Sequence, residues 1–130
     1  MKFKMLLWYM ARRMELLART HPEFIARLHG RDFTLQISSD EGSVRYYRVR
    51  HNRVVSRNAA HSTPSMTLQF ASDDMGFELL SKADPAAFMA AMQSGDVKVS
   101  GDFSLLMWFM SIAPFMRPHF RNRQAKKAIA

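Results

Sequence analysis

The sequence from Ser65 to Leu80 reads Ser-Met-Thr-Leu-Gln-Phe-Ala-Ser-Asp-Asp-Met-Gly-Phe-Glu-Leu-Leu. Apolar and polar residues alternate over 66–70, which predicts a strand with one apolar face. Ser72 then stands where a helix N-cap belongs, and the two aspartates after it suit the positive end of a helix dipole. This stretch therefore predicts a strand that leads at once into a short helix.

The residues downstream predict another helix, a strand and a last helix. An Asp-Pro pair at 84–85 places aspartate at a cap and proline in the first turn, and Gly95 ends that helix. Residues 97–100 alternate as a short strand, and Gly101 leads into a helix over about 103–113. The C-terminal half therefore mixes helices and strands.

The residues upstream predict two helices followed by three strands. Apolar residues recur at helical spacing from Phe3 to Leu17, and Thr20 with Glu23 matches a capping box for a second helix that Gly30 ends. The segments that then alternate as strands are 33–38, 44–50 and 53–57. All the elements together predict an α+β fold, whose strands have one apolar and one polar face as antiparallel sheets allow.

The length and composition indicate one folded domain. The chain has 130 residues, of which 48% are hydrophobic and 23% charged, which suits a single globular core. We assign residues 1–116 to this domain, with N-terminal helices in 1–29, and residues 117–130 to a basic, flexible tail. The chain contains no cysteine, which excludes disulfides and thiolate chemistry.

The N-terminus lacks the features of a signal peptide. Two arginines follow its apolar run at once, and no small-residue cleavage site appears. The longest apolar run, 105–116, is broken by Ser111 and Pro114 and is shorter than the roughly 20 residues that a bilayer span needs. We therefore expect a cytoplasmic protein.

The last predicted helix is apolar on every side. One stripe comprises Phe103, Leu106, Met107 and Met110, and a second comprises Leu105, Trp108, Phe109 and Ile112. The sheet can cover one side of such a helix, so the other side either packs against the N-terminal helix or a second protomer, or lines a ligand cavity. From the residues alone we weigh ordinary packing above a cavity by roughly two to one, because apolar stripes usually mark core.

Residues 64–112 resemble the C-terminal half of sterol carrier protein domains. The shared order is an apolar strand, a capped short helix, a helix with Asp-Pro and Phe-Met, a strand bracketed by glycines, and an apolar helix. The resemblance implies a mostly antiparallel sheet of about five strands with one face covered by helices. Between helices and sheet it implies a hydrophobic tunnel that carries fatty acyl chains, sterols or other lipids, with no catalytic residue, no cofactor and no enzymatic activity. The ligand-binding residues that it implies are Phe77, Leu80, Phe88, Met92, Leu105, Met107, Trp108 and Phe109. Which face of the last helix lines the tunnel stays open.

The chain departs from the family pattern at several positions. Ser81 stands where the family often has glycine, and Arg45, Arg48 and Arg50 stand where its early strands usually carry glycines. The chain also lacks a C-terminal Ser-Lys-Leu. These departures argue against a sterol. Bacterial relatives of the family include accessory factors of ubiquinone biosynthesis, thought to hold polyprenyl intermediates, so carriage of an isoprenoid lipid in that pathway is the alternative function.

The formal net charge of +8 suits anionic partners such as nucleic acid or a phospholipid surface. Basic and aromatic residues interleave in one region and suggest a nucleic-acid-binding or protein-interaction module; they are Arg45, Tyr46, Tyr47, Arg48, Arg50, Arg53 and Arg57. We rank a solvated sheet face above nucleic-acid binding by roughly three to one, because no RNA-recognition signature is present.

The two ends of the chain suggest a membrane contact. Lys2, Lys4 and Trp8, together with the basic tail, would suit transient docking on an anionic membrane surface. The five histidines show no metal-ligand spacing, so we expect no bound metal. We expect a monomer or a homodimer.

Overall fold

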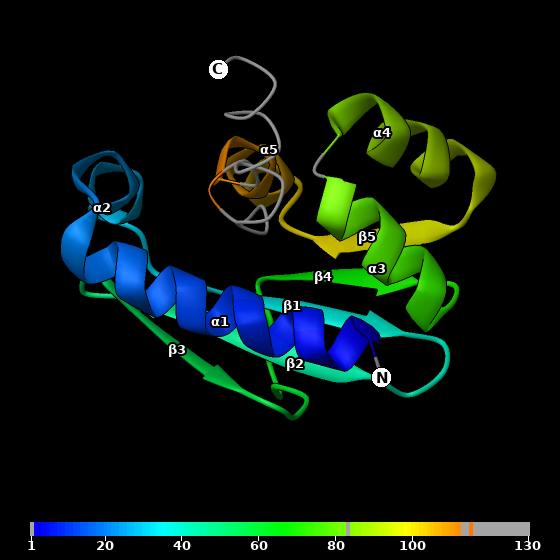
Figure 1. Cartoon of the computed structure of the whole chain (residues 1–130), viewed down its shortest axis with the longest axis horizontal. Helices are drawn as coiled ribbons and strands as arrows, with labels where there is room; N and C mark the ends of the chain where they lie inside the picture. Colours follow the sequence, from blue (N-terminus) through cyan, green and yellow to red (C-terminus); the bar gives the residue numbers. More distant parts are fainter. Residues whose placement is uncertain (1, 83, 113–114, 116–130) are drawn as a thin grey trace, which may run out of the picture.

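The computed structural model describes residues 2–82, 84–112 and 115 (Figure 1). Its strands are β1 (Phe33–Ser39), β2 (Val44–Arg50), β3 (Arg53–Arg57), β4 (Met66–Phe70) and β5 (Val97–Gly101). Its helices are α1 (Lys2–Thr20), α2 (Pro22–Leu28), α3 (Asp73–Lys82), α4 (Pro85–Ser94) and α5 (Ser104–Ile112). The predicted boundary between residues 116 and 117, and the tail beyond it, lie outside the described residues.

The strands form one sheet in the order β3-β2-β1-β4-β5. Neighbouring strands pair antiparallel except β1 and β4, which pair parallel. The helices lie together over one face of this sheet, with α1 running across it and α3, α4 and α5 beside α1 (Figure 1). The predicted α+β class, with a mostly antiparallel sheet covered on one face, is confirmed.

Alternation along the strands decides which face is buried. The side chains of Leu35 and Ile37 on β1, and of Met66, Leu68 and Phe70 on β4, are almost fully buried under the helices. The polar residues between them, such as Gln36 and Thr67, lie on the other face, where they pair with one another in register. The core therefore lies between the sheet and the helical layer.

Helix α1 is the central element of the helical layer. Its apolar face is buried at Phe3, Leu6, Leu7, Met10, Ala11, Met14 and Leu17. Helix α3 approaches it at Gly76, where an added Cβ would collide with the ring of Phe3. The Tyr47 hydroxyl of β2 donates a hydrogen bond of 2.8 Å to the Leu7 carbonyl, which ties this helix to the sheet.

Most predicted caps are confirmed, but one is wrong. The carboxylate of Asp84 accepts from the Ala86 N–H at 3.0 Å, and Gly95 ends α4 with φ of 87°. Thr20, the predicted cap of α2, is instead the last residue of α1, and its hydroxyl donates to the Leu16 carbonyl. Because α1 extends through Thr20, the cap falls on His21, whose Nδ1 accepts from the Phe24 N–H at 3.4 Å.

Candidate functional site

Helix α5 is held in place by its second predicted stripe. Leu105, Trp108, Phe109 and Ile112 are all buried. The Trp108 indole N–H donates a hydrogen bond of 2.8 Å to the Arg27 carbonyl at the end of α2. Its ring meets Phe33 of β1 edge to face, with centroids 4.7 Å apart. This stripe therefore joins α5 to both α2 and the sheet.

The first predicted stripe of α5 is divided between core and surface. Leu106 is buried and Met110 is half-buried, whereas Phe103 is 48% exposed and Met107 is 70% exposed. The helix is thus apolar on every side without being covered on every side. Its outer face, around Met107, is apolar surface.

The structure brings seven of the eight predicted ligand-binding residues into or against one hydrophobic cluster. Four of them, Phe88, Leu105, Trp108 and Phe109, are buried, and three, Phe77, Leu80 and Met92, are half-buried at its margin. Phe88 meets Phe70 of β4 edge to face at 6.2 Å, which places α4 over the sheet. Met107 lies outside this cluster, on the exposed side of α5.

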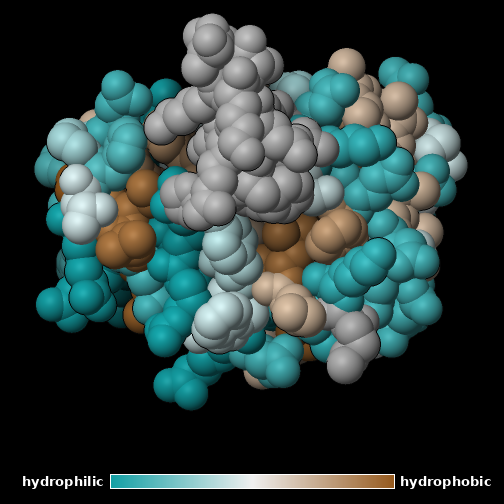
Figure 2. Space-filling view, in the orientation of Figure 1, coloured by the Kyte–Doolittle hydropathy of each residue, from teal (hydrophilic) through white to brown (hydrophobic). Residues whose placement is uncertain are grey.

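Figure 2 shows apolar surface in a hollow near the middle of the helical face, between α1 and α3. The apolar side chains that are half-buried against the core come from all three C-terminal helices; they include Met75, Phe77, Leu80, Ala87, Met92 and Met110. Apolar side chains that are partly exposed above an apolar sheet face are typical of a surface that binds an apolar ligand or partner.

An open apolar groove of about 550 Å³ lies where α1 meets α3. Its walls are Met5, Leu6, Trp8 and Tyr9 of α1 and Phe77 of α3, with Lys2 and Lys4 at its margin. Met5 is 69% exposed and Trp8 is 53% exposed, and the Lys2 ammonium lies 5.8 Å from the centre of the Phe77 ring. The sequence indicated Lys2, Lys4 and Trp8 as surface residues suited to a membrane contact, but it did not indicate Met5. Helical spacing could have done so, because Met5 lies three residues before Trp8 and therefore on the same side of the helix.

The ionisable groups with shifted pKa values have structural partners. The Ser39 hydroxyl, donating to Asp73, lowers the pKa of that carboxyl, and the Ser104 side chain and N–H do the same for Asp102. Among residues 2–82, 84–112 and 115, no group of three or more histidines and carboxylates could hold a metal ion. Within the same residues, no helix is long and apolar enough to cross a membrane.

The predicted basic face of the sheet is smaller than the sequence suggested. Tyr47 points into the core and is fully buried. Arg45 pairs in register with Ile37, so it lies on the helical side as well. Alternation explains both corrections, because every second residue of β2 must face the helices. Arg48, Arg50 and the two arginines of β3 remain on the uncovered face.

Comparisons with known proteins support this description of the fold. No protein-family model matches the sequence, and no curated protein matches it significantly. Solved structures do match: the chain has the fold of sterol carrier protein 2 domains, as residues 64–112 predicted.

Three examples, each aligned over most of the chain, illustrate the match. A UbiJ-SCP2 ubiquinone synthesis protein aligns with a TM-score of 0.61 and 17% identity, over 83% of this chain and 95% of its own. The sterol carrier protein domain 2 of Helicoverpa armigera aligns with a TM-score of 0.62 and 15% identity, over 83% and 84% of the two chains. Sterol carrier protein 2 of Aedes aegypti, solved in complex with palmitate, aligns with a TM-score of 0.60 and 16% identity, over 88% and 96%.

Proposed function

We propose that this protein binds and carries a hydrophobic ligand without catalysing a reaction on it. The observation that carries the proposal is the set of half-buried apolar side chains of α3, α4 and α5 above the apolar sheet face. A structure of the same fold holds palmitate, which supports a ligand with an acyl or similar chain. Sterol-like and isoprenoid lipids share the required apolar surface.

We place the ligand in a tunnel between the sheet and these three helices. Phe88, Leu105, Trp108 and Phe109 would form its floor and walls, and Phe77, Leu80 and Met92 its margin. Met107 lies on the exposed face of α5, unlike the other predicted residues. Substituting it therefore tests which face of α5 contacts the ligand. Methionine suits such a site, since its flexible thioether adapts to apolar shapes that vary.

Two matched substitutions test the placement. Met92→Lys adds a charge at the half-buried margin, and we expect it to weaken binding of a fluorescent fatty acid at least tenfold. Met107→Lys makes the same chemical change on the exposed side of α5, and we expect less than a twofold effect. Both lysines can reach water, so both variants should fold. Equal effects of the two substitutions would refute this placement of the tunnel.

The identity of the ligand is tested by native mass spectrometry of protein purified without detergent, followed by organic extraction. We expect a stoichiometric lipid. A protein that carries none, and that also fails to bind the fluorescent fatty acid, would mean that the helices fill the space above the sheet. The proposal of a carrier would then be abandoned.

A second candidate is an accessory role in ubiquinone biosynthesis. It is favoured by the likeness to the UbiJ-SCP2 ubiquinone synthesis protein, 95% of which is covered. In that case the extracted lipid should be a polyprenyl quinone or one of its prenylated precursors. A fatty acid or phospholipid in its place would favour the general carrier.

We further propose that the groove of α1 docks the protein transiently on anionic membranes. Met5 and Trp8 would enter the headgroup region, while Lys2 and Lys4 meet lipid phosphates, each contributing about 1 kcal/mol near such a surface. Vesicle co-sedimentation should show binding to phosphatidylglycerol-containing vesicles and its loss in Trp8→Ser. Met107→Ser, on another exposed methionine, serves as the control. Equal binding to neutral vesicles would count against the docking.

A further inference from the structure

Strand β3 is one edge of the sheet, and its outer side has no neighbouring strand in the described chain. The two-residue turn at 51–52 joins it to β2, so Arg50 and Arg53 form the closing pair of the hairpin. Such a pair exchanges both backbone hydrogen bonds, after which bonded and non-bonded pairs alternate. Val54 and Ser56 therefore direct their N–H and C=O groups away from β2, toward the open edge.

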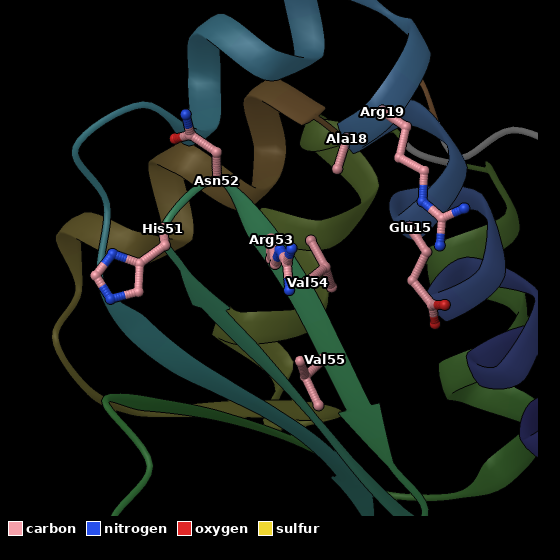
Figure 3. A pocket seen from close by; sticks show the side chains of 8 residues that line it. All are labelled: Glu15, Ala18, Arg19, His51, Asn52, Arg53, Val54 and Val55. Carbon is pink, nitrogen blue, oxygen red and sulfur yellow. The ribbon is translucent and has the colours of Figure 1, made fainter.

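A hollow lies on each side of this edge. One, of about 600 Å³, separates β3 from the C-terminal half of α1, with the side chains of Glu15 and Arg19 across from Val54 (Figure 3). The other, of about 480 Å³, lies on the uncovered face of the sheet. Residues common to both are His51, Arg53 and Val55. The two hollows therefore meet at β3.

The charge around both hollows is mainly positive. Arginines at 19, 48, 50 and 53 line them. Arg48 forms an ion pair with Asp32 at 3.4 Å, and Glu15 forms one with Arg12 at 3.6 Å. Within the described residues, no ion pair to a carboxylate is formed by Arg19, Arg50 or Arg53. The Arg50 Nε–H donates to His51 Nε2 at 3.2 Å, which leaves the other N–H groups of its guanidinium, and the side chains of Arg19 and Arg53, to meet an anionic partner.

We propose that β3 binds an extended acidic segment of a partner protein, which adds to the sheet as a sixth strand. The backbone of the segment would pair with Val54 and Ser56. Because successive side chains of a strand point to opposite faces, acidic side chains would enter the two hollows in turn. On the helical side they meet Arg19, and on the uncovered side they meet Arg50 and Arg53.

The chemistry of the edge favours a peptide over a nucleic acid. An edge strand presents donors and acceptors in alternation at a fixed spacing, and a second peptide backbone repeats the matching alternation at that same spacing. The phosphates of a nucleic acid only accept, so binding through phosphates would satisfy Arg50 and Arg53 but leave the outward carbonyls of Val54 and Ser56 without donors. The exposed Val55 between the arginines also suits an apolar side chain of the partner strand.

The experiment is selection from a random library of ten-residue displayed peptides on the full-length protein. We expect enriched peptides with Asp or Glu at adjacent positions, because neighbouring side chains of the added strand enter opposite hollows. A synthetic version of a selected peptide should bind the Arg53→Glu variant at least tenfold more weakly than the wild type. Lys98→Glu, at the opposite edge of the sheet, makes the same change of charge, and we expect less than a twofold effect.

Two further measurements test the backbone pairing. Ser56→Pro removes the outward N–H and should abolish binding. N-methylation of alternate peptide amides should do the same while leaving the protein unaltered. Failure to enrich any peptide, enrichment without acidic residues, or binding that survives N-methylation would overturn the proposal. So would a single-stranded oligonucleotide that binds through Arg53 and that the selected peptides cannot displace.

Discussion

Gly101 occupies a position where both its backbone angle and its surroundings require glycine. Its φ is +95°, and an added Cβ would meet the backbone of Ser65 and Met66. Gly42, in the turn between β1 and β2, has the same φ of +95° but no atom within 4 Å of such a Cβ. Substitution of either glycine therefore carries the cost of an unfavourable φ, but only a substitution of Gly101 adds a collision with backbone atoms.

We expect Gly42→Ala to lower the free energy of unfolding by about 1 kcal/mol, from the unfavourable φ alone. Gly101→Ala should cost about 1–3 kcal/mol more, because backbone atoms cannot move aside as a side chain can. Urea unfolding of both variants at 25 °C measures the difference. Equal losses would show that the strand end relaxes around the new methyl group.

The two tryptophans form a second matched pair. Trp108→Phe keeps an aromatic ring against Phe33 but leaves the Arg27 carbonyl without the indole donor. We expect a loss of about 1–2 kcal/mol and faster amide exchange in α2. Trp8→Phe, on an exposed side chain, should change the stability by less than about 0.5 kcal/mol. If amide exchange in α2 stays as slow as in the wild type, α5 does not anchor that helix.

At the residue scale, the sequence predicted most caps because a cap depends on neighbours close in the chain. Asp84 and Gly95 are examples. The exposure of Met107 could not be predicted in this way. On a helix that is apolar all round, periodicity does not indicate which side the rest of the protein covers.

At the scale of elements, the turn after β1 is tied to the first turn of α3. The Ser39 hydroxyl donates to the Asp73 carboxylate at 2.5 Å, and the Asp73 N–H donates to the Glu41 carboxylate at 2.6 Å. The Ser39 bond holds the pKa of Asp73 below its usual range. A lowered folded-state pKa means that the ionised form stabilises the fold.

This stabilisation should be present above the unfolded-state pKa of about 3.9 and should disappear as the pH falls through the lower folded-state value. Asp73→Asn should therefore be less stable than the wild type at pH 7, with the difference closing in acid. Thermal unfolding between pH 2 and 7 measures it, with the exposed Asp74→Asn as control. A difference that stays constant with pH would assign the effect to packing.

Periodicity and cap signals predicted the type of each helix and strand in the described chain, but they could not predict which strands are neighbours. Alternation in β4 shows which side chains face the helices and is silent on whether β4 lies beside β3 or β1. The structure places it parallel to β1. That choice depends on how the connection over 58–65 crosses the sheet, which is a property of the whole chain.

At the scale of the whole molecule, Tyr47 joins the helical layer to the sheet. Burial raises the pKa of its hydroxyl, which also donates to the Leu7 carbonyl. A raised folded-state pKa means that the neutral form stabilises the fold. This contribution is complete below the unfolded-state pKa of about 10 and is lost as the pH rises above it.

We expect the free energy of unfolding to fall between pH 9 and 11, and to fall less steeply in Tyr47→Phe, which should be the less stable protein at pH 7. Urea unfolding across this range is the measurement, with Tyr46→Phe, on the uncovered face, as control. A slope that is unchanged in Tyr47→Phe would attribute alkaline unfolding to other groups.

The resemblance to sterol carrier proteins implied Phe88 and Phe109 as ligand-binding residues, and the structure gathers both into one core. Their contact with a ligand stays a prediction. The groove between α1 and α3 was only partly predicted, because it depends on the close approach at Gly76. Contacts between segments more than 70 residues apart leave no local pattern.

The central position of β1 has a consequence for the chain as it is synthesised. Its two neighbours are β2, a few residues away, and β4, which begins only at Met66. While the ribosome makes the intervening residues, one edge of the innermost strand has no partner, and the apolar face of α1 has only part of its sheet to cover. Unpaired edges of nascent chains invite association with other chains. Chaperone capture or aggregation of this protein should therefore peak before residue 66 has emerged, and the hairpin of β1 and β2 is the segment that needs protection.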